Sequence, residues 1–194
     1  RLRYNQLYGL YFNEMLIFFE DSLAETVRGA LVRGKLDAGL RGRLEDFRWE
    51  EARHTEMFRG LNNLAAPELY RGGNDHFGRA PAAARAALEW ASGRPRLFPL
   101  FLWIMLLQEE RAVHWSREVL LGRETLEPHF VAAHRLHLAD EVAHARVDAE
   151  LIDIFWAAAS LPARRLNAAM LRWLLGEFFN LPKRAGMRVL ERWL

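Results

Sequence analysis

The chain has 194 residues, 51% hydrophobic and 12% aromatic, a composition typical of one globular domain with a sizeable core. Its formal charge is only +2 and both signs are interspersed, so there is no electrostatic case for a nucleic-acid partner. It contains no cysteine, which excludes disulfides, thiolate metal sites and a thiol nucleophile. The lack of cysteine fits a reducing cytoplasm, the compartment that we expect.

Helical periodicity runs through nearly the whole chain and strand signals are almost absent, which predicts an all-α fold. Glycine and proline punctuate the pattern, since Gly34 and Gly122 end helices and Pro128 suits a first helical turn. The expected helices span, in chain order, about residues 3–33, 35–62, 82–92, 97–121, 127–159 and 163–179, with a terminal helix from Pro182 to Leu194.

A long connection, with breakers between residues 63 and 81, separates two pairs of long helices that are each joined by a short loop. Two helical hairpins joined by one long crossover are the ferritin-like arrangement. We therefore expect a single domain over residues 1–194. It consists of a ferritin-like four-helix bundle over about 3–159, with additional C-terminal helices over about 163–194.

The C-terminal helices carry Leu and Trp residues that either pack onto the bundle or form a homodimer contact, and the sequence does not choose. The most apolar stretch, residues 97–107, is interrupted by Pro99 and too short for a membrane span. The first residues, Arg1 to Tyr4, are not typical of a signal peptide.

One spacing of potential metal ligands occurs twice. A glutamate is followed about thirty residues later by Glu-x-x-His, and Glu-x-x-His occurs nowhere else in the chain. Such a carboxylate on one helix and Glu-x-x-His on the next is how a helical bundle builds a two-metal site. The first set is Glu20, Glu51 and His54, and the second set, 90 positions later, is Glu110, Glu141 and His144.

These side chains lie on apolar helix stripes, so they are expected inside the bundle. Buried carboxylates and imidazoles without partners would strongly destabilise the fold, and a pair of metal cations resolves this. A nitrogen and oxygen ligand set without sulfur suits iron or manganese. In the third long helix both Glu109 and Glu110 can face inward, and the 90-residue register selects Glu110. A helical bundle that binds no metal remains the simplest alternative.

His137 lies one turn before Glu141, on the same helix face, where the first half of the chain has Phe47. It is either a core histidine bonded to a carbonyl or an additional nitrogen ligand, and we favour the ligand because Glu141 brings its metal within reach.

Four further residues are candidates for contacts with the ligands. Glu50 and Asp140 precede the central glutamates, and a crosswise pairing of Asp140 with His54 and Glu50 with His144 would orient both rings. The alternative is a solvated helix face. The other two candidates, each one turn beyond a predicted ligand, are Asp148 and His114.

With the third histidine included, the second half reads His137-x-x-Asp140-Glu141-x-x-His144, and the motif Glu-x29-[Glu/Asp]-Glu-x-x-His occurs twice. Over roughly residues 20–148 this pattern resembles the p-aminobenzoate N-oxygenase family of diiron oxygenases. The resemblance implies two iron ions, with manganese as the other candidate. It implies as their seven ligands Glu20, Glu51, His54, Glu110, His137, Glu141 and His144.

Members of that family use O2 and reduced diiron to oxidise arylamines. The resemblance therefore implies an oxygenase that acts on O2 and a small-molecule substrate, by N-oxygenation of an amine or by hydroxylation. An external electron donor is needed, because none is encoded in the chain. The first motif departs from the family pattern in having Glu50 where the family has Asp.

The bacterial family of predicted metal-dependent hydrolases is similar in its fourth helix, but its second helix usually has a further histidine where this chain has Phe58. The alternative functions are accordingly a dimetal-dependent hydrolase and a non-enzymatic iron-binding or ferroxidase bundle.

Overall fold

The computed structural model describes residues 2–72, 76–77, 82–122 and 126–193. Every regular element in these residues is a helix, which confirms the all-α prediction. The helices are α1 (Leu2–Arg33), α2 (Ala38–Ala65), α3 (Pro67–Tyr70), α4 (Ala82–Ser92), α5 (Leu100–Leu121), α6 (Pro128–Ala158) and α7 (Leu161–Trp193).

Local chemistry at the helix ends explains where two of the long helices begin. The Asp37 side chain accepts a hydrogen bond from the Leu40 backbone N–H at 2.8 Å and so caps α2. At the start of α6 the Glu127 carboxylate accepts from the Phe130 N–H at 2.8 Å, and Pro128 occupies the first turn. These caps satisfy backbone N–H groups that have no partner inside the helix.

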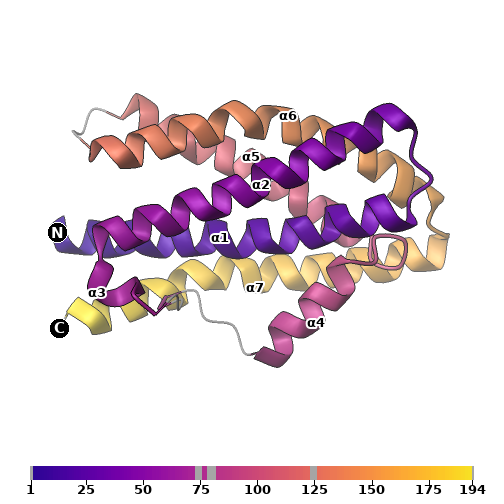
Figure 1. Cartoon of the computed structure of the whole chain (residues 1–194). Coiled ribbons are helices and arrows are strands. Elements are labelled where there is room, and N and C mark those ends of the chain that lie inside the picture. Colours follow the sequence, from indigo (N-terminus) through magenta and orange to yellow (C-terminus); the bar gives the residue numbers. More distant parts are fainter. Residues whose placement is uncertain (1, 73–75, 78–81, 123–125, 194) are drawn as a thin grey trace.

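The bundle is made of two antiparallel hairpins. Helix α1 packs on α2, α5 packs on α6, and α2 packs on α6 between the hairpins (Figure 1). The crossover from α2 to α5 contains the short helix α3 and helix α4, and α4 lies against α1. This is the ferritin-like arrangement that the long connection predicts.

Helix α7 differs from the prediction of two separate C-terminal helices. It is one continuous helix of 33 residues that passes through Pro182 and packs along α1 and α5 (Figure 1). A proline inside a helix removes one backbone hydrogen bond, and packing against the bundle on both sides of Pro182 stabilises the helix despite that loss. The C-terminal segment thus packs onto the bundle.

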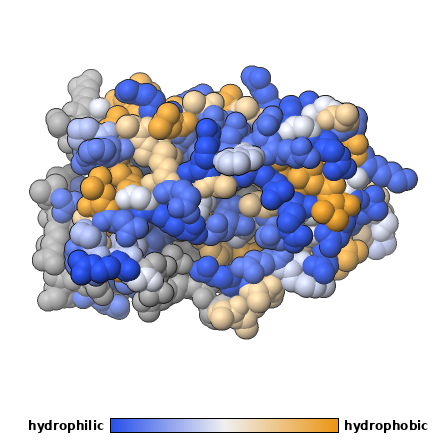
Figure 2. All heavy atoms as spheres, viewed as in Figure 1, coloured by the Kyte–Doolittle hydropathy of each residue, from blue (hydrophilic) through white to orange (hydrophobic). Residues whose placement is uncertain are grey.

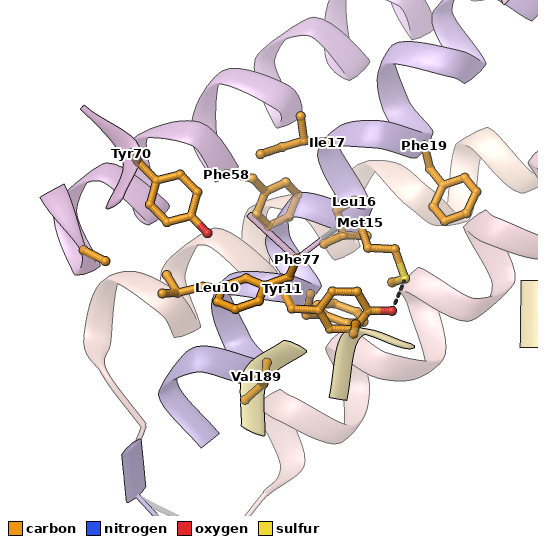
Figure 3. Packing of buried hydrophobic residues seen from close by; sticks show 13 residues of the cluster. Leu10, Tyr11, Met15, Leu16, Ile17, Phe19, Phe58, Tyr70, Phe77 and Val189 are labelled. Carbon is orange, nitrogen blue, oxygen red and sulfur yellow. Dashed lines mark hydrogen bonds between the residues drawn. The ribbon is translucent and has the colours of Figure 1, made fainter. Parts of the chain in front are cut away.

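The buried apolar side chains form two clusters, one near each end of the bundle. One cluster joins Leu16, Phe58 and Phe77 to α7 residues such as Val189 (Figure 3). The other cluster joins residues of all four bundle helices, including Val27, Leu44, Met105 and Val147. On α1 and α2 the predicted ligands lie between residues of the two clusters, so a polar layer crosses the bundle between them.

The surface is mixed in character. Figure 2 shows hydrophilic side chains over most of one face, with apolar side chains between them. None of the helices in the described residues is both long and apolar enough to cross a membrane, as the sequence predicts.

Candidate metal centre

Seven side chains from the four bundle helices converge in the polar layer. They form three overlapping groups in which one ligand atom per residue lies within 4.8 Å of the others, and every member is buried. Six of the seven predicted ligands are among them. The groups are Glu20 with His54 and His137, Glu51 with Glu109 and His144, and Glu51 with His54 and Glu141.

Two glutamates lie at the middle of the cluster. The Glu141 Oε1 atom is 3.1 Å from His137 Nε2, 3.4 Å from His54 Nδ1 and 3.7 Å from His144 Nδ1. The Glu51 Oε1 atom is 3.0 Å from His144 Nδ1 and 3.7 Å from His54 Nδ1. Because each of these oxygens faces more than one imidazole, Glu51 and Glu141 have the positions of carboxylates shared by two metal ions.

Glu20 lies on one side of this centre only. Its Oε1 is 3.0 Å from His137 Nε2 and its Oε2 is 3.6 Å from His54 Nδ1. Glu109 lies on the other side, grouped with His144. The two sides are therefore unequal, since one has two histidines and the other has one.

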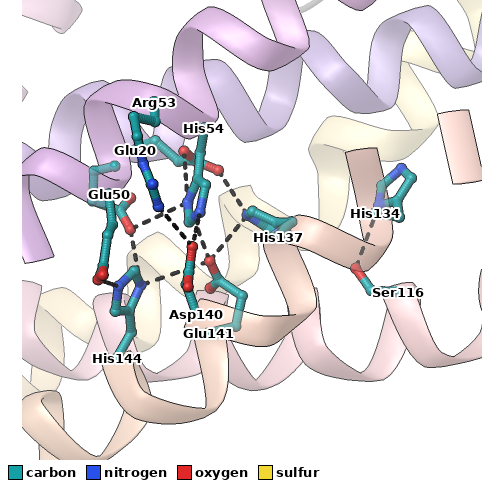
Figure 4. Close-up of polar contacts among 11 residues, drawn as sticks. Glu20, Glu50, Arg53, His54, Ser116, His134, His137, Asp140, Glu141 and His144 are labelled. Carbon is teal, nitrogen blue, oxygen red and sulfur yellow. Dashed lines mark hydrogen bonds and ion pairs between the residues drawn. The ribbon is translucent and has the colours of Figure 1, made fainter. Parts of the chain in front are cut away.

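Outer carboxylates hold two of the three imidazole rings. His54 Nε2 lies 3.1 Å from Asp140 Oδ2, and His144 Nε2 lies 2.8 Å from Glu50 Oε2 (Figure 4). Both contacts of the predicted crosswise pairing are thus present. Arg53 adds a contact of 3.2 Å to the same Asp140 oxygen. An imidazole that donates its Nε2–H outward presents the Nδ1 lone pair inward.

The structure does not bring the predicted ligand Glu110 into the cluster, because its side chain is exposed, whereas Glu109 is only 2% exposed and lies in the cluster instead. Among the buried residues of α5, a series at alternating spacings of three and four comprises Leu102, Met105, Glu109, Ala112 and Ser116, and Gln108 is buried next to Glu109. The start of α5 is apolar almost all round, so hydrophobicity does not define its inner face. These spacings run through Glu109 and continue with the small residues Ala112 and Ser116. This pattern could have identified Glu109 as the inward-facing acid.

The structure places the two other predicted residues, His114 and Asp148, differently. His114 is exposed, so the structure does not bring it to the buried ligand cluster. It lies one turn after Glu110 on α5, and both side chains are on the exposed side of that helix. Asp148 is fully buried, as predicted, but neither of its oxygens has a hydrogen-bond partner among the described residues. The structure therefore places Asp148 inside the bundle without a bond to any ligand.

Burial and neighbouring charges shift the pKa values of the acids in the cluster. Burial, with the charges of Glu51 and Glu141, raises the pKa of Glu20 well above its usual value. Burial and Glu51 likewise raise the pKa of Glu141. Burial acts in the same direction on Glu51, but the adjacent imidazoles of His144 and His54 outweigh it and lower the pKa of Glu51. Such a cluster is stabilised by added positive charge.

The donor atoms fit a pair of metal ions. Several inward atoms have no hydrogen-bond partner among the described residues, and each such buried atom costs about 1–3 kcal/mol. All are nitrogen or oxygen donors of the kind that iron and manganese bind. The atoms are Glu20 Oε2, Glu51 Oε1, His54 Nδ1, Glu109 Oε1, Glu141 Oε1 and His144 Nδ1.

Two phenylalanines of α2 cover histidines of α6. The Phe47 ring stacks on His144 with centroids 4.0 Å apart, and Phe58 packs edge-on against His137 at 5.0 Å. The equivalent positions of α6, 90 residues later, are His137 and Asp148. The two halves thus share their ligand spacing but differ at the next turn on each side, where α2 is apolar and α6 is polar.

The comparisons with known proteins agree with this geometry. The chain matches the protein family described as p-aminobenzoate N-oxygenase AurF over residues 11–192, a range that includes every residue of the cluster. No curated protein and no solved structure gives a significant match. With a family match over nearly its whole length, the chain belongs to the p-aminobenzoate N-oxygenase family and is an oxygenase of the non-haem diiron type.

Proposed function

We propose that this protein binds two iron ions and uses O2 to N-oxygenate a small amine. The observation that carries the proposal is the convergence of buried carboxylate and imidazole donors from four helices into three overlapping groups. The proposed ligands are Glu20, Glu51, His54, Glu109, His137, Glu141 and His144. Membership of the N-oxygenase family supports iron over manganese and amine oxidation over other chemistry.

The geometry supports a division of the ligands between the two ions. Glu20, His54 and His137 would hold one ion, and Glu109 and His144 would hold the other. Glu51 and Glu141 would contribute to both, because their oxygens face histidines of both sides. More side chains would then hold the first ion than the second.

When bound, the reduced iron pair would supply electrons that activate O2. The chain's own residues set the geometry for that chemistry. Asp140 and Glu50 accept the outer N–H groups of His54 and His144 and so hold both rings in the orientation that faces the centre. The apolar clusters on either side exclude water from the polar layer.

Oxidation of a primary amine to a hydroxylamine consumes one O2, two electrons and two protons, and releases one water. One oxygen atom forms the new N–O bond and the other leaves as water. The chain holds no redox group of its own beyond the proposed metals, so we infer an external electron donor.

The test is oxygen incorporation by iron-loaded protein. Protein purified without chelator and loaded with ferrous iron should bind two irons per chain and, with a chemical reductant, convert p-aminobenzoate or another arylamine to a product that carries 18O from 18O2. Oxidation should also produce a near-ultraviolet absorption band that zinc-loaded protein lacks. A protein that binds two irons but incorporates no oxygen into any arylamine would overturn the proposal, and hydrolytic activity of colourless zinc-loaded protein would favour a hydrolase.

A further inference from the structure

A buried histidine outside the ligand set occupies an unusual position on α6. His134 lies one turn before His137 and is 0% exposed. Its counterpart 90 residues earlier is Leu44, which is also fully buried. The fold accepts a hydrocarbon side chain at this position of the repeat, so packing alone does not explain an imidazole there.

The hydrogen bonding of His134 leaves one ring nitrogen unsatisfied. Ser116 Oγ lies 3.3 Å from His134 Nδ1 (Figure 4). The Ser116 hydroxyl has no other acceptor among the described residues, so it donates to Nδ1 and leaves the imidazole proton on Nε2. That Nε2–H has no hydrogen-bond partner in the described parts of the chain. A buried donor without an acceptor destabilises a fold, which points to a partner from outside the chain.

Aromatic rings from all four bundle helices surround this imidazole. The centroid distances to His134 are 4.5 Å for Phe130, 5.4 Å for Trp115, 5.7 Å for Phe58 and 6.2 Å for Phe12. We call these four residues the aromatic shell. Phe12 and Trp115 also stack on each other at 3.7 Å.

The aromatic shell connects the metal centre to the surface. Phe58 packs against both His134 and His137, so the shell begins at a proposed ligand. Trp115 of α5 and Phe130 of α6 are partly exposed, so at these two residues the shell reaches the surface. A planar ring that packs against the aromatic shell would meet apolar faces and, at their centre, the Nε2–H of His134.

We propose that His134 recognises the substrate, with its Nε2–H donating a hydrogen bond to a carbonyl-type oxygen on a planar aromatic substrate whose ring packs against the aromatic shell. The inference rests on the proposed function, because it places the substrate within one helical turn of the metal centre. His134 is thereby a specificity residue, and a substrate without the acceptor leaves the buried donor unpaired and binds less tightly.

The experiment compares two probes that differ in one group. 4-Aminoacetophenone and 4-ethylaniline have the same ring and amine, but only the ketone has an oxygen for the Nε2–H. Their dissociation constants would be measured by equilibrium dialysis with ferrous protein under anaerobic conditions, where no turnover occurs. Wild-type protein should bind the ketone roughly tenfold more tightly.

Three variants locate the source of that preference. His134→Leu, which installs the residue of the first half of the repeat, should bind the two probes equally. His134→Gln keeps a side-chain N–H donor and should retain part of the preference. His114→Leu is the matched surface control and should leave the preference unchanged, since His114 is exposed.

Each outcome of this experiment either supports or overturns the role of His134 in substrate recognition. Wild-type protein that binds the probes equally, or binds neither, overturns the inference, and this comparison needs no variant to fold. A preference that survives in His134→Leu also overturns it, and would indicate that the Nε2–H merely faces the Phe130 ring. Oxygen uptake plays no part in the measurement, so a protein that shows the preference but no oxygenase activity would contradict only the proposed function.

Discussion

At the scale of single residues, the choice between Glu109 and Glu110 shows how a shift of one position changes a site. Neighbouring residues of an α-helix point about 100° apart, so only one of the two acids can face the centre. Glu109 is buried beside Glu51 and His144, and Glu110 is exposed. A substitution of Glu109 therefore tests the metal centre, and the same substitution of Glu110 is its control.

Glu109→Gln should weaken binding of one of the two metal ions by at least about tenfold, because it removes a charged ligand from one side of the centre. Glu110→Gln should leave binding of both ions unchanged. Metal titration followed by elemental analysis of the dialysed proteins measures both. Equal losses in the two variants would contradict the assignment.

Most of the centre could be predicted from the sequence, since Glu20, Glu51, His54, Glu141 and His144 recur at one spacing. Glu51 lies 31 positions after Glu20, whereas Glu141 lies 32 positions after Glu109. A repeat therefore predicts which helices supply ligands, but it does not predict the rotation of a helix that is apolar on all sides.

The outer carboxylates make a second prediction. Asp140→Asn and Glu50→Gln should each weaken metal binding by about 10- to 100-fold, because a neutral partner no longer orients the imidazole or raises its basicity. The expected control is Asp46→Asn, at an exposed position of α2. Competition with a coloured chelator gives the affinities, and unchanged values in Asp140→Asn and Glu50→Gln would show that the crosswise pairs do not support the ligands.

His134 predicts a pH dependence of stability. Burial lowers the pKa of His134 from 6.5 to about 4. Between these values the unfolded chain binds more protons than the folded protein, so the free energy of unfolding falls as the pH is lowered. The full effect is about 3 kcal/mol. His134→Leu lacks this contribution.

The free energy of unfolding of His134→Leu relative to wild type should therefore increase by about 3 kcal/mol between pH 7 and pH 4. Urea unfolding of both metal-free proteins over this range measures the difference. The titrations of the other buried groups are common to the two proteins and largely cancel. A difference that stays constant across the range would contradict burial of a neutral His134.

At the scale of elements, helix α1 approaches the end of α4 so closely that the contact requires glycine. A Cβ atom added to Gly29 would lie 2.4 Å from the Gly93 carbonyl oxygen and 2.9 Å from Pro95 Cδ. The same carbonyl accepts a hydrogen bond from Arg33 at 2.8 Å. Since the obstacle is backbone, it cannot move aside as a flexible side chain would.

Gly29→Ala should therefore lower the free energy of unfolding by about 1–3 kcal/mol. Gly60→Ala, on the exposed side of α2 with no atom near the added Cβ, should raise it by about 0.5–1 kcal/mol through helix propensity. Chemical unfolding of both variants gives the two values. A neutral or stabilising Gly29→Ala would mean that α1 and α4 are not held this closely.

The arrangement of the long helices could be predicted because periodicity, glycines and prolines mark them clearly. The single long helix at the C-terminus could not be predicted, because a proline such as Pro182 normally signals a new helix. The contacts of α7 with α1 and α5 explain why the helix continues. Helix α3 was missed for a similar reason, since its four residues lie among turn formers.

At the scale of the whole molecule, the proposed metal centre would couple metal binding to the stability of the fold. Glu20 and Glu141 are buried acids that repel Glu51. An ion that binds only the folded state relieves this repulsion and stabilises the protein in proportion to the logarithm of its concentration. Removal of metal should lower the Tm.

Scanning calorimetry of metal-free protein with increasing ferrous or manganous ion should show a Tm that rises by several degrees as the centre fills. Glu51→Gln, which removes a shared carboxylate, should show a smaller rise. Magnesium, which binds few all-protein sites, serves as the comparison ion. A Tm that is insensitive to every ion would indicate a bundle that holds no metal.

The unequal distribution of the three imidazoles predicts an order in which the protein takes up metal ions. In the proposed centre two of the three rings belong to one position, so the two ions would be held with different strengths. A protein given a single equivalent of metal should fill one position before the other, and a different ion added afterwards should enter the vacant one. The difference between α2 and α6 at the positions of Phe47 and His137 would thus make the two metal positions of the proposed centre chemically distinct.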